Sequence, residues 1–298
     1  MQLANVRVVA EGLAFPEGPV ALEDGSVLVV ELVGGRVTRV KPDGSKATVA
    51  ETGGGPNGLA VGPDGALYLC NNGGLDGSGT ACIQRIDLDT GRFETLYASA
   101  GDKKLKAPND LVFDETGNFW ATDFGGGAVY YASPDGSKIG CVVDDAAGPN
   151  GVGLSPDGKT LYWAQTFTRQ VMLRRLTAPG KAIPSATWGI GPLVRGGATD
   201  PSTMLIGLPG ARELDSLAVD SAGNICVGTL VEAGISVISP DGESDELWTL
   251  PPELAEAAVT NICFGGRDLR TAYITCSLTG RLVACDWPRP GLKLQYNR

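Results

Sequence analysis

Residues 56–70 read PNGLAVGPDGALYLC, and this short stretch decides the fold. A polar residue, Asn57, opens a short apolar run, a Pro-Asp-Gly turn follows, and a second apolar run ends at Cys70. Short apolar runs separated by Gly, Pro and Asp are typical of antiparallel strands joined by tight turns. The stretch therefore predicts a β-hairpin that begins at Asn57.

The same pattern recurs five more times along the chain. The polar residues that open the six copies, called the anchors below, are Glu17, Asn57, Asn109, Asn150, Asp215 and Asn261. Successive anchors lie 40, 52, 41, 65 and 46 residues apart. Periods of about 40–50 residues with several strands each are typical of propeller blades. We therefore predict an all-β fold, in which residues 1–298 form one six-bladed β-propeller domain.

The geometry of a propeller assigns the anchors to one end of its central channel. The innermost strand of a blade lines the channel, so the anchors should lie together at the end that we call the top. The loop after the second strand returns to this end. Two segments, 99–107 and 179–211, exceed the length that a blade needs, and we expect both to cover the top as lids. Residues 6–9 should form a strand of the last blade and close the ring.

The charge of the chain excludes several classes of partner. Acidic side chains outnumber basic ones by 34 to 24, and the resulting net charge of −10 repels nucleic acid. The sequence has no run of about 18 apolar residues that would span a membrane. We therefore expect a small molecule as partner, neither nucleic acid nor membrane, and leave the oligomeric state open.

Cysteine usage points to a reducing compartment. The seven cysteines are an odd number without a Cys-x-x-Cys pair, which favours free thiols over disulfides. Residues 1–12 lack the basic and apolar regions of a signal peptide. We expect a cytoplasmic protein.

Histidine is absent from the chain, and its absence restricts the chemistry. Ser-His-Asp and Cys-His machinery is excluded, as is every zinc or iron site with a histidine ligand. Catalysis must use carboxylates, amides, or a metal held by oxygen atoms.

The anchors supply such oxygen atoms. Asn is common in turns, and this accounts for the Asn-Gly pairs that begin at Asn57 and Asn150, but Glu17 has no turn preference. Carboxylate and amide oxygens that converge on one axis are the ligands of a hard cation such as Ca²⁺. The anchors therefore predict a metal at the mouth of the channel.

Four motifs resemble those of a known family. They are FPEGP at residues 15–19, PND at 108–110, PNG at 149–151 and TNICFGG at 260–266. In this order and spacing they resemble the senescence-marker-protein/gluconolactonase/LRE-like (SGL) family of calcium-dependent lactonases, over nearly the whole chain. The resemblance implies a six-bladed propeller that binds a divalent cation and hydrolyses lactones.

Carried over by position, the resemblance implies metal ligation by Glu17, Asn150 and Asp215. Asn109 matches a residue that contacts the substrate or, through water, the metal. Asn57 and Asn261 match positions that line the pocket. The resemblance favours Ca²⁺, with Mn²⁺, Mg²⁺, Zn²⁺ and Fe²⁺ as alternatives, since oxygen ligands do not choose among several of these ions.

Our hypothesis for the reaction is that the metal polarises the lactone carbonyl while a carboxylate activates water. Asp215 is the favoured base, although binding to a dication weakens a carboxylate as a base. Asp123, expected on a loop at the mouth, is the rival, followed by Asp110.

The residues around Asn109 suggest a substrate less polar than a sugar lactone. Sugar-lactonase members often carry Arg two residues before this position, whereas this chain has Ala107. Lys106 is an alternative cation, and Phe124 and Phe167 add apolar surface at the mouth. We expect Asn109, Asn57, Lys106, Phe124 and Phe167 to bind substrate.

Two other interpretations stay open at this point. One is a different enzyme on a related propeller, with a strictosidine-synthase-like or isomerase activity, because fold does not fix chemistry. The other is a non-catalytic propeller that binds a protein on its top face. Such a scaffold has no need of Glu17 and Asp215 at the axis.

Overall fold

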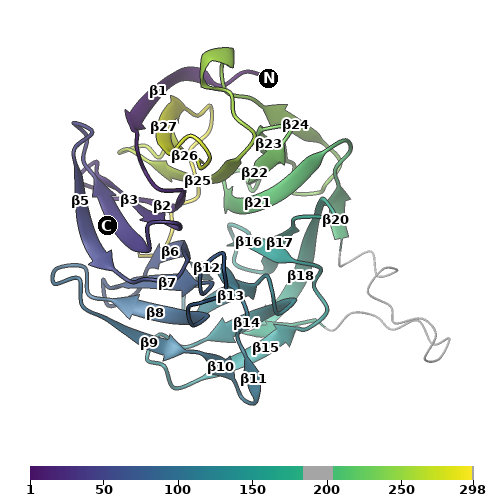
Figure 1. Cartoon of the computed structure of the whole chain (residues 1–298). Helices are drawn as coiled ribbons and strands as arrows, with labels where there is room; N and C mark the ends of the chain where they lie inside the picture. Colours follow the sequence, from purple (N-terminus) through teal and green to yellow (C-terminus); the bar gives the residue numbers. More distant parts are fainter. Residues whose placement is uncertain (184–203, 297–298) are drawn as a thin grey trace.

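Six antiparallel sheets surround a central axis in the computed structural model, which describes residues 1–183 and 204–296 (Figure 1). The first blade contains β2 (Pro16–Ala21), β3 (Val27–Glu31), β4 (Arg36–Val40) and β5 (Lys46–Glu51). The second contains β6 (Pro56–Val61), β7 (Leu67–Asn71), β8 (Cys82–Ile86) and β9 (Phe93–Tyr97). The third contains β12 (Pro108–Phe113), β13 (Phe119–Asp123), β14 (Ala128–Ala132) and β15 (Ile139–Val143).

The last three blades follow the same order. The fourth contains β16 (Pro149–Leu154), β17 (Thr160–Gln165) and β18 (Gln170–Ala178), with β19 (Lys181–Ala182) and β20 (Met204–Gly207) paired to β18. The fifth contains β21 (Arg212–Val219), β22 (Ile225–Val231), β23 (Gly234–Ile238) and β24 (Asp245–Trp248). The sixth contains β25 (Val259–Gly265), β26 (Thr271–Cys276), β27 (Arg281–Asp286) and β1 (Ala4–Ala10). A turn of 3-10 helix spans Pro252–Leu254.

The ring is closed by the N-terminal strand, as the sequence predicts. β1 pairs antiparallel with β27, so the first strand of the chain is the outermost strand of the sixth blade. The innermost strands β2, β6, β12, β16, β21 and β25 contact their neighbours all the way around. The sequence-based assignment of an all-β, six-bladed propeller is confirmed.

Both segments predicted as lids differ from that expectation. The hairpin of β10 (Ser99–Ala100) and β11 (Lys103–Lys104) lies against β15, the outermost strand of its blade, and therefore away from the axis. Within segment 179–211, β19 and β20 pair with β18, and β20 extends the fourth blade at its outer side. The rest of that prediction, residues 184–203, lies outside the described residues.

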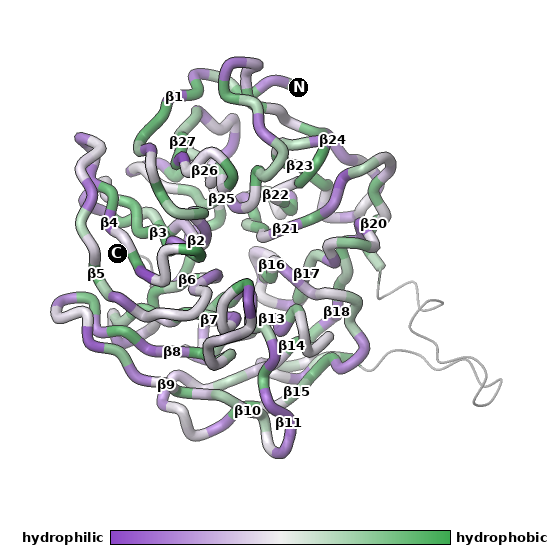
Figure 2. The backbone as a smooth tube through the Cα atoms, viewed as in Figure 1, coloured by the Kyte–Doolittle hydropathy of each residue, from purple (hydrophilic) through white to green (hydrophobic). Residues whose placement is uncertain are grey.

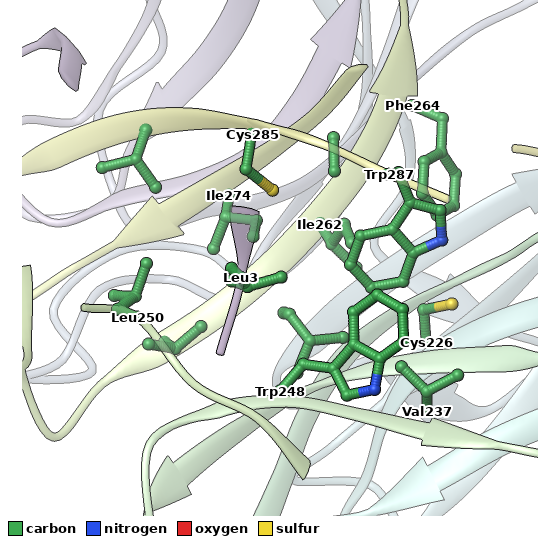
Figure 3. Close-up of a cluster of buried hydrophobic side chains, with 14 of the residues drawn as sticks. Leu3, Cys226, Val237, Trp248, Leu250, Ile262, Phe264, Ile274, Cys285 and Trp287 are labelled. Carbon is green, nitrogen blue, oxygen red and sulfur yellow. The ribbon is translucent and has the colours of Figure 1, made fainter. Parts of the chain in front are cut away.

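Apolar packing between blades holds the ring together. Within the described residues, six clusters of buried apolar side chains occupy the six interfaces between neighbouring blades. In the cluster between the fifth and sixth blades, the Trp248 and Trp287 ring centroids lie 4.6 Å apart, and Leu3 packs beside them (Figure 3). Each fully buried large apolar side chain contributes about 1.5–3 kcal/mol. Hydrophilic residues lie mainly in the turns and at the periphery (Figure 2).

The C-terminal segment crosses the bottom of the propeller, opposite the anchors. The N–H of Leu292 donates a hydrogen bond to the carbonyl of Val219, at the lower end of β21. The distance between the two atoms is 3.0 Å, which is typical of a good hydrogen bond. The ring of Tyr296 lies 5.7 Å from that of Phe113, at the lower end of β12. The segment therefore runs from the fifth blade to the third.

The described residues contain no helix that is long and apolar enough to cross a membrane.

Close approach of neighbouring blades requires glycine beside the anchors. A Cβ atom added to Gly58 would lie 2.5 Å from the Cα of Asp110 and 2.6 Å from the carbonyl oxygen of Asn109, both in the next blade. Real Cβ atoms do not approach this closely, and the obstacles are backbone atoms with little freedom to move.

We predict that Gly58→Ala lowers the free energy of unfolding by about 1–3 kcal/mol, because the added methyl forces the second and third blades apart. Gly140→Ala is the matched control: Gly140 lies on the outer strand β15 with no atom within 4 Å of its added Cβ. Chemical denaturation measures both variants. Equal stability of the two would contradict this account of blade packing.

Candidate active site

Each innermost strand carries a register shift at its anchor. The shift lies between Glu17 and Val20 in the first blade and between Pro149 and Val152 in the fourth, and the other four innermost strands have one at the matching place. An extra residue in one strand re-aims the side chain at that point, and such bulges are frequent next to active sites. The shared irregularity places the anchors at the top of the channel.

The sixth blade corrects one predicted anchor. The N–H of Ser277 bonds to the carbonyl of Ala258, as that of Thr166 bonds to Gly148, so Thr260 is the residue that matches Asn150. Asn261 lies one residue further along the channel. The sequence alone suggested Asn261 as the anchor because most other blades have asparagine there. In the sixth blade the anchor position holds Thr260, and the asparagine follows it.

Asn261 is level with Asp110 in the third blade. In both, the side-chain Oδ1 accepts a hydrogen bond from the N–H of the next residue, at 2.8 Å from Ile262 and 2.9 Å from Leu111. The channel therefore has a top ring of anchors and, one residue below it, a second tier that includes Asp110 and Asn261.

Glu17 is a buried carboxylate surrounded by neutral donors. Its Oε2 accepts hydrogen bonds from the Gly18 N–H and from Nδ2 of Asn261, both at 3.0 Å. Burial raises the pKa of Glu17, while hydrogen bonds from Thr260, Asn261 and Gly18 lower it in part. Asn261 therefore orients Glu17 from below.

Asn150 and Asp215 lie in adjacent blades and contact each other. A hydrogen bond from Asn150 reaches the Asp215 carboxylate. The Asn150 amide is fixed on both sides, since its Nδ2 donates to Thr166 Oγ1 at 3.2 Å and its Oδ1 accepts from Ser216 Oγ at 3.4 Å. Three neighbouring residues therefore fix the orientation of the Asn150 side chain.

Asp215 as a whole residue is only half-buried, whereas Glu17 and Asn150 are buried. Burial of the carboxyl group nevertheless raises its pKa well above the ordinary value, and the negative charges of Glu17 and Asp110 raise the pKa further. The hydrogen bond from Asn150 lowers the pKa in part. A carboxylate with a raised pKa is suited to accept a proton.

Asp110 lies in the second tier and is also buried. Burial raises the pKa of Asp110 to about 7, and the charge of Glu17 adds to the rise. Hydrogen bonds from Leu111, Val152 and Ser216 lower the pKa in part. Three acidic groups, Glu17, Asp110 and Asp215, therefore share one channel and repel one another.

The residues present fit a bound divalent cation. None of the ion pairs between described residues includes Glu17, Asp110 or Asp215, so their charge is not balanced by an Arg or Lys side chain. The buried Oδ1 atoms of Asn57 and Asn109 have no hydrogen-bond partner. Uncompensated buried carboxylates and amide oxygens are costly unless a ligand satisfies them.

The donor set is mixed. Within the described part of the chain, no group of three His, Cys, Asp or Glu side chains is placed to hold a metal ion. Carboxylates alone therefore do not form the site, and amide oxygens such as that of Asn150 must contribute. Mixed carboxylate and amide oxygens suit Ca²⁺.

Asp123 is not on an open loop, contrary to the sequence-based expectation. It ends β13 and is fully buried. Its carboxylate accepts hydrogen bonds from the N–H groups of Lys106, at 3.0 Å, Ala107, at 2.7 Å, and Gly126, at 2.9 Å. Asp123 is occupied in holding the chain just before Asn109, which argues against a role as base.

Three other blades have a hydrogen-bonding side chain at the position that matches Asp123. The residues paired with the proline before an anchor are Glu31, Asn71, Asp123 and Gln165. Each accepts a hydrogen bond from the backbone of the segment that leads to the anchor. These side chains position the anchors, and Asp123 is one of this series.

The remaining predicted substrate-binding residues lie around the mouth. Lys106 is exposed, and Phe124 is half-buried over Gly148. Phe167 is exposed, and its ring centroid lies 5.8 Å from that of Phe124 in an edge-to-face arrangement. The two rings therefore form a pair beside Asn150, whose amide is held by the residue before Phe167.

Three hydroxyl residues of the site were missed by the sequence analysis. Ser216 and Thr166 hold Asn150, and Thr260 bonds to Glu17. Ser216 had a detectable signal, because it stands where three other blades have glycine directly after the anchor. Thr166 and Thr260 offered no such contrast.

A family model matches most of the chain. Residues 15–278 match the model of the SMP-30/Gluconolactonase/LRE-like region. Among curated proteins, a lactonase drp35 from Staphylococcus haemolyticus is 28% identical over 245 residues, covering 80% of this chain and 70% of the relative. A gluconolactonase from Zymomonas mobilis is 25% identical over 302 residues, covering 91% of this chain and 79% of the relative.

Solved structures show the same fold. A gluconolactonase from Xanthomonas campestris superposes with a TM-score of 0.76 at 23% identity, covering 96% of this chain and 90% of that one. A calcium-binding regucalcin from Agrobacterium tumefaciens gives a TM-score of 0.74 at 18% identity, with 98% of each chain covered.

The raised pKa of Asp110 predicts that ionisation of this group lowers the free energy of unfolding as pH rises. The prediction applies to the protein kept metal-free by a chelator. Its folded-state pKa, about 7, lies above the unfolded value of about 4. Its contribution to stability is therefore fully present below about pH 4 and lost as pH rises through about 7. Asp110→Asn should be more stable than the parent by up to about 4 kcal/mol at pH 8, and by only about 1–2 kcal/mol at pH 5.

Urea denaturation of both proteins in chelator measures this difference at each pH. A difference that is the same at pH 5 and pH 8 would show that Asp110 does not titrate in this range.

Proposed function

The chain belongs to the SMP-30/gluconolactonase/LRE-like family, and from this premise we propose that it is a divalent-metal-dependent hydrolase that opens the ester ring of a lactone. The observation that carries the proposal is the meeting of Glu17, Asn150 and Asp215, from three blades, at the top of one channel without a cationic side chain paired to them. The lactonase and gluconolactonase relatives support the same reaction.

The cation is proposed to be held by Glu17, Asn150 and Asp215, with Asn109 as a further oxygen donor. When bound, such an ion polarises an ester carbonyl and stabilises the negative charge that develops on its oxygen. Ca²⁺ is favoured, because the donors are hard oxygens of mixed type and the regucalcin of the same fold binds calcium. Mn²⁺, Mg²⁺, Zn²⁺ and Fe²⁺ are the alternatives for assay.

Asp215 is proposed to accept the proton of the attacking water. Its residue is only half-buried and lies beside Asn150 at the top of the channel, so a water bound there would be within its reach. The water oxygen bonds to the carbonyl carbon, the ring C–O bond breaks, and the leaving oxygen takes up a proton. The product is a hydroxy acid.

The orphaned amide oxygens have a role in this scheme. Oδ1 of Asn57 and Oδ1 of Asn109 are buried acceptors without a donor, and both belong to top-ring positions. A water molecule or a substrate hydroxyl supplies the missing donor. We assign Asn57 to substrate and water binding, and Asn109 to the substrate or, through such a water, to the cation.

Metal removal tests the proposed cofactor. We predict that a chelator lowers lactonase activity by at least about 100-fold and lowers the thermal midpoint, and that Ca²⁺ restores both, because a ligand of the folded state stabilises it. A pH-indicator assay across several lactones, with and without Ca²⁺, measures the activity. Acid release that is indifferent to the chelator would overturn metal dependence, and no acid release from any lactone would favour the isomerase or protein-binding alternatives.

Paired variants distinguish the two candidate bases. Asp215→Asn should lose about 10²–10⁴-fold in kcat and lose Ca²⁺ binding while keeping its fold. Asp123→Asn should instead lower the thermal midpoint, because three N–H groups lose their charged acceptor, and should keep more activity per folded molecule than Asp215→Asn.

Asp64→Asn, at a turn on the bottom of the propeller, is the control for removal of one negative charge. A folded Asp123→Asn variant as inactive as Asp215→Asn would make Asp123 the base.

A further inference from the structure

The two ends of the propeller differ in the side chains that they expose. Turns at the bottom are hydrophilic, and many contain an aspartate whose carboxylate accepts a backbone N–H, at Asp24, Asp43, Asp64, Asp135, Asp157 and Asp241. In five blades the loop at the top, between the second and third strands, carries a large apolar side chain, and in the fifth blade the last residue of β22, Val231, does so. We call these six residues the apolar rim: Val33, Leu75, Phe124, Phe167, Val231 and Leu278.

The rim is exposed to solvent in five of the six blades. Exposed fractions are 63% for Val33, 76% for Leu75, 67% for Phe167, 56% for Val231 and 65% for Leu278, while Phe124 is half-buried. Isolated exposed apolar residues are ordinary. Five exposed large apolar side chains at the top of the propeller, at the same end as the candidate active site, are what an apolar ligand would require.

Short connections link the rim to the top ring. The N–H of Phe124 donates to the carbonyl of Ala107, two residues before Asn109, at 2.9 Å. Leu278 follows Ser277, whose hydroxyl donates to the carbonyl of Pro16, beside Glu17, at 2.7 Å. Phe124 and Leu278 therefore lie next to the segments that carry the anchors Asn109 and Glu17.

The contact between Phe124 and Phe167 is the best-defined part of the rim. Their edge-to-face pair connects the third and fourth blades, next to Asn150. The carbonyl of Thr166 also accepts the N–H of Leu214, the residue before Asp215, at 3.3 Å. The pair thus flanks the positions of both Asn150 and Asp215.

Val231 carries an additional sign of function. This β-branched residue has a positive φ of 67°, in the left-handed region that favours glycine. Strained backbone of this kind persists where the surrounding structure enforces it, and it is concentrated at binding sites. The strain holds an apolar side chain at the mouth where glycine would be easier to accommodate.

We propose that the apolar rim binds the hydrocarbon substituent of the substrate, so that the preferred substrate is a lactone with an alkyl or aryl substituent, not a polyhydroxylated sugar lactone. The proposal rests on the proposed lactonase function and deepens it. The ester ring lies at the top ring of anchors, and the substituent points outward and packs against the Phe124–Phe167 pair. A membrane surface is disfavoured as the occupant, because a net charge of −10 repels anionic lipids.

The test is a series of γ-lactones assayed with Ca²⁺: unsubstituted γ-butyrolactone, its methyl, butyl and hexyl derivatives at the ring carbon next to oxygen, and glucono-δ-lactone. We expect kcat/KM to rise about two- to fourfold per added methylene, until the chain outgrows the rim, because each buried methylene contributes to binding. Glucono-δ-lactone should be a poorer substrate than the hexyl lactone.

Rim variants locate the effect. Phe167→Ala and Phe124→Ala should reduce the ratio of kcat/KM for the hexyl and methyl lactones at least about fivefold, and Phe167→Leu should keep most of it. Phe93→Ala is the matched control, since Phe93 is an exposed phenylalanine on the outer strand β9. Circular dichroism and thermal unfolding verify that each variant is folded.

Failure of the proposed lactonase function and failure of the apolar-substrate proposal give different results. If no lactone is hydrolysed, the proposed function is wrong. Hydrolysis without chain-length dependence, or with glucono-δ-lactone preferred, overturns the apolar substrate alone. Chain-length dependence that survives both Phe→Ala changes overturns the assignment to the rim, and a concurrent loss of self-association in gel filtration would make the rim an interface between copies of this chain.

Discussion

The structure depends on the repulsion of acidic side chains held inside one channel. Glu17, Asp110 and Asp215 come from the first, third and fifth blades. Burial raises the pKa of all three, and the charge of Glu17 raises the pKa of Asp110 and of Asp215 further. Left alone, such groups would be expelled to water. A closed ring of blades, packed through six apolar interfaces and completed by β1, is rigid enough to hold them together. We propose that a bound divalent cation would relieve this repulsion.

The residues around the anchors have different positioning roles. Ser216 and Thr166 fix the amide of Asn150, and Asn261 orients Glu17. Asp123 and its counterparts in other blades hold the chain that leads to each anchor. Asp215 differs from Glu17 and Asn150 in that its residue is only half-buried. This greater exposure, next to Asn150, is the basis for its proposed role as base.

The sequence predicted the blade pattern well because the repeat depends on local chemistry. Each copy pairs a turn of Gly, Pro and Asp with apolar strands, so blade number, ring closure and most anchors could be predicted from short strings. Features that depend on register were less accessible. The bulge at Thr260 moved Asn261 to the second tier, and Asp123 looked like a loop residue until its three backbone donors were placed. The hairpin Ser99–Lys104 and strand β20 resembled lids because their partners in space, β15 and β18, are distant from them in the sequence.

A crystal structure of the protein soaked with Ca²⁺ tests the central claim most directly. The account predicts one strong density peak at the top of the channel, about 2.3–2.6 Å from side-chain oxygens of Glu17, Asn150 and Asp215. The absence of a peak between these three residues at saturating Ca²⁺, or carboxylates turned away from one another, would contradict it.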